Sequence, residues 1–145
     1  MKIIIQEPPK GEEESIILNV REMTANVVQA INILKSPGSI TVYTDEGEAF
    51  MLPSADVFYA ESVDLKTFVY SQKYVYRSKL KLYELEELLS AGEYLRISKQ
   101  VIVNVKKIRS VAAAGSGRFQ ATMLNGEKLI ISRQYVPLLK ERLGL

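Results

Sequence analysis

From Ala55 onward, the sequence is a succession of short segments rich in aromatic and β-branched residues, separated by polar turns. Segments of this length and composition favour β-strands, and such short turns favour antiparallel pairing. Asn125-Gly126 gives the strongest hairpin signal, because this dipeptide readily forms a two-residue turn between strands. The pattern predicts a mainly β fold of the α+β class, with strands over 57–62, 67–71, 74–77, 94–98, 101–103, 107–112, 118–124 and 128–131.

Two helices interrupt this β pattern. The leucines of residues 82–89 fall on one face of a predicted helix, which ends at Ala91-Gly92. A second helix is predicted at the C-terminus, after Ser132 and through about Arg142, with its apolar residues on one face. Pro137 is unfavourable in mid-helix, so we expect the regular helix to begin near it, after a tighter turn.

Residues 1–54 show a different pattern, typical of a small α/β extension. We predict strands over 2–6 and 15–20, a helix over 23–34 that ends at Ser36-Pro37-Gly38, and a hairpin of 40–43 and 49–52. A segment of roughly 50 residues makes a poor independent core, so its apolar faces must be buried against the rest of the chain or another molecule. The chain therefore divides into an extension over 1–54, which serves packing, dimerisation or regulation, and a β-rich domain over 55–145.

The composition argues against an enzyme. The chain has no Cys and no His, which removes thiolate zinc sites, cysteine nucleophiles and the commonest general base. It has no phosphate-binding or calcium-binding loop motif, and its acidic clusters at 12–14 and 84–87 are typical of solvated turns and helix faces. We therefore expect no catalytic activity, no metal and no cofactor. No apolar stretch approaches the ~20 residues of a membrane span, so we expect a soluble, cytoplasmic protein.

The net charge of +2 conceals an asymmetry between the two units. Residues 1–54 carry four basic and eight acidic residues, whereas residues 55–145 carry fifteen basic and nine acidic ones. A basic unit of this size is a candidate surface for a polyanion such as nucleic acid, and an ordinary mixed-charge surface is the alternative.

Many basic side chains of the second unit lie in the predicted turns. A rigid β scaffold can present such side chains to base edges and phosphates. The set comprises Lys66, Lys73, Arg77, Lys79, Lys81, Lys99, Lys106, Lys107, Arg109 and Arg133. Each residue alone is typical of a solvated surface, and the spacing leaves open whether they share one face.

Residues 55–145 resemble the LytTR DNA-binding domain of bacterial transcription regulators. The similarity lies in residues 56–62, 82–89, 96–104, 108–111 and 129–136, in the order and spacing of the family. The R-x-S-x-x-x-x-V-N pattern of residues 96–104, combined with the S-R-x-Y pattern of residues 132–135, is specific to it. The whole chain is similar to stand-alone members, which carry a short N-terminal extension in place of a receiver domain.

This resemblance implies an elongated domain of mostly antiparallel β-strands, with one helix between strands and one at the C-terminus. It also implies that loops of the β scaffold, rather than a recognition helix, read successive major grooves of double-stranded DNA. Members commonly occupy pairs of short direct repeats, so a homodimer is expected at least on DNA. A regulatory partner, with a small membrane protein among the candidates, is a further expectation.

Three loop positions of the family point at bases, and they fall here on Lys66, Lys99 and Arg133. Arg133 can offer a bidentate fork to guanine, whereas Lys99 acts as a point charge. Phosphate or supporting contacts are expected from Ser98, Gln100, Asn104, Lys107 and Gln134, and more weakly from Lys73 and Arg77. For Asn104 a turn-forming side chain is the alternative, and for Ser132 a helix N-cap.

The sequence therefore favours a sequence-specific transcriptional regulator that binds double-stranded DNA. The alternative is a β-rich protein-interaction module whose basic face meets an acidic partner. Binding of single-stranded nucleic acid would need exposed aromatic residues among the lysines, and only Tyr74 and Tyr76 offer that.

Overall fold

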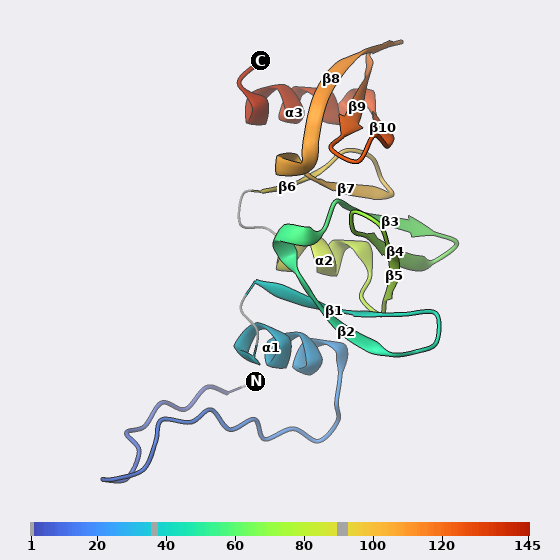
Figure 1. The fold of residues 1–145 in the computed structure, drawn as a ribbon. Coiled ribbons are helices and arrows are strands. Elements are labelled where there is room, and N and C mark those ends of the chain that lie inside the picture. The colour runs from blue at the N-terminus through green and yellow to red at the C-terminus, as the bar shows by residue number, and fades with distance from the viewer. Residues whose placement is uncertain (1, 36–37, 90–92) are drawn as a thin grey trace.

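The computed structural model describes residues 2–35, 38–89 and 93–145, whose strands form two antiparallel sheets (Figure 1). The larger sheet has the order β2-β1-β5-β4-β3-β7-β6. Its strands are β1 (Ser39–Tyr43), β2 (Ala49–Pro53), β3 (Tyr59–Val63), β4 (Lys66–Tyr70), β5 (Val75–Ser78), β6 (Tyr94–Arg96) and β7 (Val101–Asn104). The smaller sheet has the order β10-β9-β8 and consists of β8 (Ile108–Gly115), β9 (Arg118–Met123) and β10 (Lys128–Ile131).

Within the described residues, three α-helices and three 3-10 turns accompany the sheets. The helices are α1 (Ala25–Lys35), α2 (Leu82–Leu88) and α3 (Val136–Leu143), and the 3-10 turns are η1 (Ser54–Asp56), η2 (Val105–Lys107) and η3 (Arg133–Tyr135). Pro137 stands in the first turn of α3, directly after η3, as predicted. The predicted helix stops at 36–37 and 91–92 lie outside the described residues. The mainly β, antiparallel fold with one helix between strands and one at the C-terminus is confirmed.

Two hydrophobic cores lie on opposite faces of the central strands, because successive side chains of a strand alternate between its faces. In β3, Tyr59 enters one core and Ala60 the other, and in β7, Val103 and Ile102 divide in the same way. The Ala60 core is closed by α2 and by the β1–β2 hairpin, through Leu82, Leu85, Leu89, Ile40, Val42 and Leu52. The Tyr59 core is closed by the smaller sheet and α3, through Ala121, Met123, Ile131, Val136 and Leu139. The β1–β2 hairpin is therefore built into the larger sheet.

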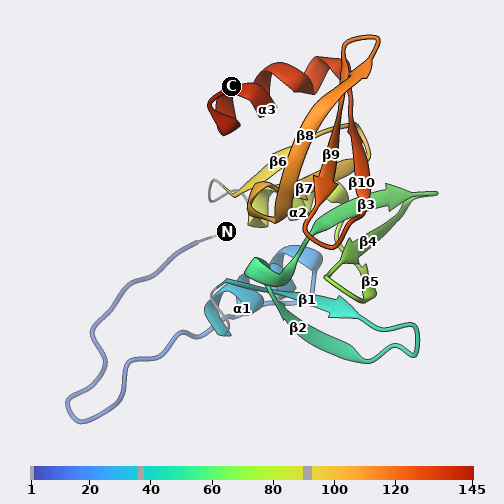
Figure 2. The ribbon, with the colours of Figure 1, turned by 45° about the horizontal axis from the view of Figure 1, so that its top comes forward.

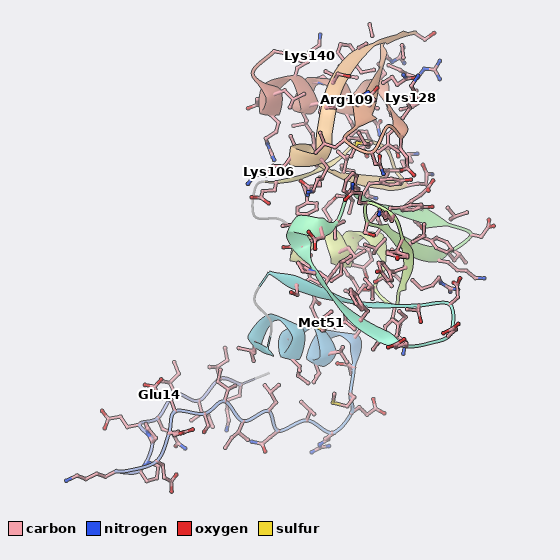
Figure 3. All side chains as sticks on the ribbon, viewed as in Figure 1. Glu14, Met51, Lys106, Arg109, Lys128 and Lys140 are labelled. Atoms are coloured by element: carbon pink, nitrogen blue, oxygen red, sulfur yellow. The ribbon has the colours of Figure 1, made fainter. Side chains whose placement is uncertain are left out.

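The N-terminal segment departs from the sequence prediction. The strands predicted over 2–6 and 15–20 are wrong: residues 2–22 form neither helix nor strand, and every residue in them is exposed. Both views show this segment extending away from the sheets, and Figure 3 labels Glu14 on it (Figures 1, 2 and 3). A β-strand forms by hydrogen bonding to a neighbouring strand, and no described strand pairs with these exposed residues.

The first helix is also shorter than predicted. It begins at Ala25, where the Thr24 hydroxyl accepts a hydrogen bond from the Val27 amide (3.4 Å). Val27 is buried on the sheet, but Met23 and Leu34 are exposed, so its apolar face covers less than the spacing indicated. No helix within the described ranges is long and apolar enough to cross a membrane.

Candidate nucleic-acid interface

The three residues predicted to contact bases lie in turns at the same end of the larger sheet. Lys66 opens β4 after the tight β3–β4 turn, Lys99 lies between β6 and β7, and Arg133 follows β10 as the first residue of η3. Their side chains are all exposed. The strand register places the first two at the same end of β3, on either side of it. Lys66 in β4 pairs with Val63, and Val101, which follows the turn of Lys99, pairs with Glu61.

Backbone hydrogen bonds join the three turns directly. The Ser62 amide donates to the Gln100 carbonyl (2.8 Å), which connects the end of β3 to the turn that carries Lys99. The Ser132 amide donates to the Ile97 carbonyl (2.8 Å), which connects that turn to the start of η3. We refer to residues 62–66, 97–100 and 132–134 as the basic edge. A rigid hydrogen-bonded edge of this kind holds long cationic side chains in a fixed relative order.

The β3–β4 turn has an unusual backbone. Asp64 and Leu65 both have positive φ angles, 49° and 65°, as two-residue hairpin turns require. Gly or Asn usually occupies such positions, so this turn is held by its strands against some local strain. The strain presents Leu65 fully to solvent beside Lys66. Leu65 was not among the predicted site residues, because a single leucine within a β pattern is typical of a buried core position.

The turn containing Lys99 is fixed by its own polar groups and by Arg96. The Ser98 hydroxyl accepts from the Gln100 amide (3.2 Å), so it shapes the turn. The Arg96 guanidinium donates to the carbonyls of Ser98 (2.9 Å) and Lys99 (2.7 Å). Gln100 and Lys99 are exposed, whereas Ser98 is half-buried.

Arg133 and Gln134 are exposed at the start of η3. Ser132 occupies the N-cap position of this turn, but its side chain makes no capping hydrogen bond there; its carbonyl accepts from the Tyr135 amide instead (2.8 Å). The aliphatic part of Arg133 lies against Gly117, in the β8–β9 turn. The smaller sheet therefore supports the basic edge from the side.

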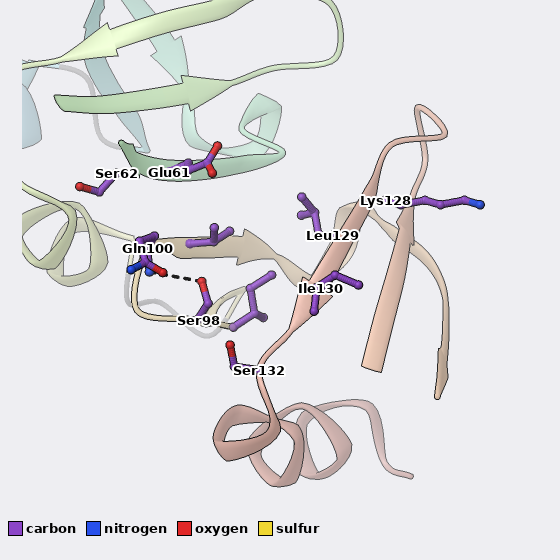
Figure 4. Close-up of a pocket in the computed structure, with 10 residues that line it drawn as sticks. Glu61, Ser62, Ser98, Gln100, Lys128, Leu129, Ile130 and Ser132 are labelled. Carbon is purple, nitrogen blue, oxygen red and sulfur yellow. Dashed lines mark hydrogen bonds between the residues drawn. The ribbon is translucent and has the colours of Figure 1, made fainter. Parts of the chain in front are cut away.

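A pocket of about 490 Å³ opens between β3, the turn of residues 97–100 and β10 (Figure 4). Its lining includes Ser62, Ser98, Gln100 and Ser132 from the basic edge, and the charged residues Glu61 and Lys128. The Glu61 carboxylate accepts a hydrogen bond from the Tyr70 hydroxyl (3.3 Å), and burial together with this carboxylate raises the pKa of Tyr70. The pocket lining therefore carries one acidic and one basic side chain.

The structure does not bring Lys73 and Lys107 to the basic edge. Both follow the far ends of strands, after β4 and β7, and they line a second pocket of about 340 Å³ together with Phe58. A five-residue strand such as β4 separates its two ends by roughly 15 Å. Arg77 lies closer to the basic edge, opposite Phe68 in the register, with its guanidinium 5.4 Å from the centre of that ring.

Asn104 does not face solvent, so it must be removed from the predicted phosphate contacts. Its side chain is 1% exposed, its Nδ2 donates to the Val57 carbonyl (2.9 Å), and its Oδ1 accepts from the Lys106 amide (3.1 Å). Both ends of the amide are used inside the protein, and the side chain caps η2. The turn-forming alternative is therefore the correct one for Asn104.

Comparisons with known proteins place this geometry in context. The family model described as the LytTr DNA-binding domain matches residues 47–144. A Staphylococcus aureus protein (strain NCTC 8325) described as an uncharacterized HTH-type transcriptional regulator is 28% identical over 139 residues, which cover 93% of each chain. The sensory transduction protein LytT of Enterococcus faecalis is 25% identical over 138 residues; the match covers 92% of this chain but only 57% of LytT.

The fold also matches a solved structure. The LytTr DNA-binding domain of a Bacillus cereus protein superposes with a TM-score of 0.70 and 29% sequence identity. The match covers 76% of this chain and all of that domain.

Proposed function

The chain belongs to the LytTR family of DNA-binding domains, and from this premise we propose that it regulates transcription by reading double-stranded DNA with its basic edge. The observation that carries the proposal is the pair of backbone hydrogen bonds that join the turns of Lys66, Lys99 and Arg133. Because these turns are fixed to one another, their side chains can enter successive stretches of major groove as a unit. The family is defined by DNA binding, and no catalytic role is proposed.

Each turn has side chains suited to a different contact. Arg133 can donate two parallel hydrogen bonds to O6 and N7 of guanine, while Lys66 and Lys99 act as point charges with less geometric selectivity. The exposed Leu65 can make an apolar contact with a thymine methyl group. Ser98, Gln100 and Gln134 belong to the basic edge, where polar side chains can reach phosphates and fix the register of the protein on DNA.

We propose further that two protomers occupy paired direct repeats, joined by residues 2–22. This segment exposes an unusual number of large apolar side chains for a monomer: Ile3, Ile4, Ile5, Ile16, Ile17 and Val20. Its acidic character makes direct contact with DNA unfavourable, so a second protomer is the occupant we propose. Ile4→Asp combined with Ile17→Asp should abolish cooperativity on a two-repeat duplex and leave single-repeat affinity unchanged. Retained cooperativity would contradict this, and a small membrane protein would become the candidate partner.

The function is tested by selecting duplexes from a random pool with the purified protein. Enrichment of a motif that occurs as a direct repeat is the expected result. The absence of enrichment at moderate salt would contradict the proposal and favour the other candidate, a protein-interaction module with a basic face.

A further inference from the structure

The guanidinium of Arg96 makes three contacts in the protein. Arg96 ends β6, and its Nε and one terminal nitrogen donate to the carbonyls of Ser98 (2.9 Å) and Lys99 (2.7 Å). The other terminal nitrogen lies 3.1 Å from a carboxylate oxygen of Glu86 in α2. One planar cation therefore holds two consecutive carbonyls of a turn to a helix that belongs to the hydrophobic core.

These contacts fix the backbone from which Lys99 projects. A guanidinium presents its donors in a rigid, planar fork, so binding two carbonyls at once restricts the position and the tilt of the peptide between Ser98 and Lys99. Two further hydrogen bonds fix the turn: the Gln100 amide donates to the Ser98 hydroxyl, and the Gln100 carbonyl accepts from the Ser62 amide. The side chains of Lys99 and Gln100 are left exposed on the turn.

Glu86 holds Arg96 in this arrangement from a well-anchored element. The helix α2 is fixed by the buried Leu82 and Leu85, which point into the core. The Arg96 side chain is 25% exposed and that of Glu86 is 47% exposed. The Arg96 guanidinium already pairs with the Glu86 carboxylate and donates to two carbonyls. Arg96 is therefore poorly placed to contact a phosphate itself.

We propose that Arg96, locked by Glu86, is a positioning residue that sets the register of Lys99 in the groove and thereby contributes to sequence discrimination without touching DNA. The inference rests on the proposed function and adds a residue pair to it. The two effects of removing the Glu86 charge on DNA affinity are opposite. Simple electrostatics predicts stronger attraction to DNA, whereas loss of the Glu86–Arg96 ion pair, which we call the brace, should weaken binding to the correct sequence.

The test compares Glu86→Gln and Arg96→Lys with the wild type, by titrating the full chain against the selected duplex and a scrambled duplex. Glu87→Gln is the matched control, because Glu87 is exposed on the same helix and carries the same charge. Arg109→Lys controls for the loss of a guanidinium at an exposed position. The melting temperature of each variant is measured to check that the fold is retained.

We expect Glu86→Gln and Arg96→Lys to lower the ratio of specific to non-specific affinity by about tenfold, the scale of one lost base contact, and both controls to leave it unchanged. If the Glu86→Gln variant binds the selected duplex as tightly as the Glu87→Gln variant does, the proposed role of the brace is wrong. Equal losses on both duplexes for Arg96→Lys would also overturn it, because they would mark Arg96 as a phosphate contact. A wild-type chain that does not distinguish the two duplexes would overturn the proposed function, and the brace with it.

Discussion

Gly117 lies directly against the side chain of Arg133: a Cβ atom placed on Gly117 would be 2.6 Å from Cδ of Arg133 and 2.9 Å from its Cγ. Real Cβ atoms do not approach other heavy atoms so closely, so only glycine leaves room for the arginine in this position. Gly117 also has a φ of 77°, which favours glycine for a second reason. The β8–β9 turn thus directs an exposed arginine that belongs to another part of the chain.

Gly117→Ala should therefore impair DNA recognition through Arg133. We expect specific binding to weaken by roughly 1–3 kcal/mol, the value of one bidentate base contact, as Arg133 is displaced. Gly115→Ala is the control: Gly115 lies in the same turn at a φ of 84°, and a Cβ there meets nothing within 4 Å. Both variants share the backbone strain, so equal affinities in fluorescence anisotropy would show that the contact with Arg133 is irrelevant.

Direct removal of the side chains on the basic edge should have a similar effect. Lys99→Ala and Arg133→Ala should each weaken binding to the selected duplex by roughly 1–3 kcal/mol without changing the melting temperature, because both side chains are exposed. Lys73→Ala removes an equally exposed charge beyond the far end of β4 and should have a much smaller effect. An effect of Lys73→Ala as large as the other two would place the interface at the wrong end of the sheet.

The fold was predictable from sequence where periodicity and turn chemistry agreed. The alternation of 118–124, followed by Asn125-Gly126, gave the β9–β10 hairpin, and the leucines of 82–89 gave α2. The strands expected over 2–6 and 15–20 failed because apolar β-branched residues indicate only that a segment can extend. Strand pairing also requires a partner strand, and the local sequence pattern does not indicate whether one is available.

The candidate site was predictable only in part. The resemblance supplied Lys66, Lys99 and Arg133, and their exposure in neighbouring turns depends on register, which spacing does not give. Gly117 contacts Arg133 from another turn, so its local sequence carries no signal of a part in the basic edge. Arg96 begins the R-x-S-x-x-x-x-V-N pattern, but the pattern does not show that its guanidinium binds the carbonyls of Ser98 and Lys99. Asn104 was predicted from its amide, which is suited to a phosphate contact. In the structure both ends of this amide are hydrogen-bonded to backbone groups of the protein.

Salt should weaken DNA binding steeply. With a net charge of +6 on residues 55–145, several phosphates should be neutralised, and the logarithm of the affinity should fall linearly with the logarithm of salt concentration. Removing residues 2–22 should leave the slope unchanged, since an acidic segment is not expected to neutralise phosphates. Titrations between about 50 and 200 mM salt measure it, and a flat dependence would argue against a phosphate-tracking surface.

Tyr59 should make the free energy of unfolding fall at alkaline pH. Burial, and next the Glu127 carboxylate, raise the pKa of Tyr59 above its ordinary value near 10. Its contribution is therefore fully present below pH 10 and is lost at higher pH, where the hydroxyl ionises in the unfolded chain but not in the folded one. Tyr59→Phe should make the decline in unfolding free energy above pH 10 shallower in denaturant titrations. Identical slopes for the two proteins would remove Tyr59 as the cause.

The location of the basic edge is tested most directly by amide NMR during titration with the selected duplex. We expect the largest chemical-shift changes at the amides of residues 62–66, 97–100 and 132–134, and only small changes in the β4–β5 turn around Lys73. Shifts concentrated around Lys73 and Lys107, with the three turns unaffected, would contradict it.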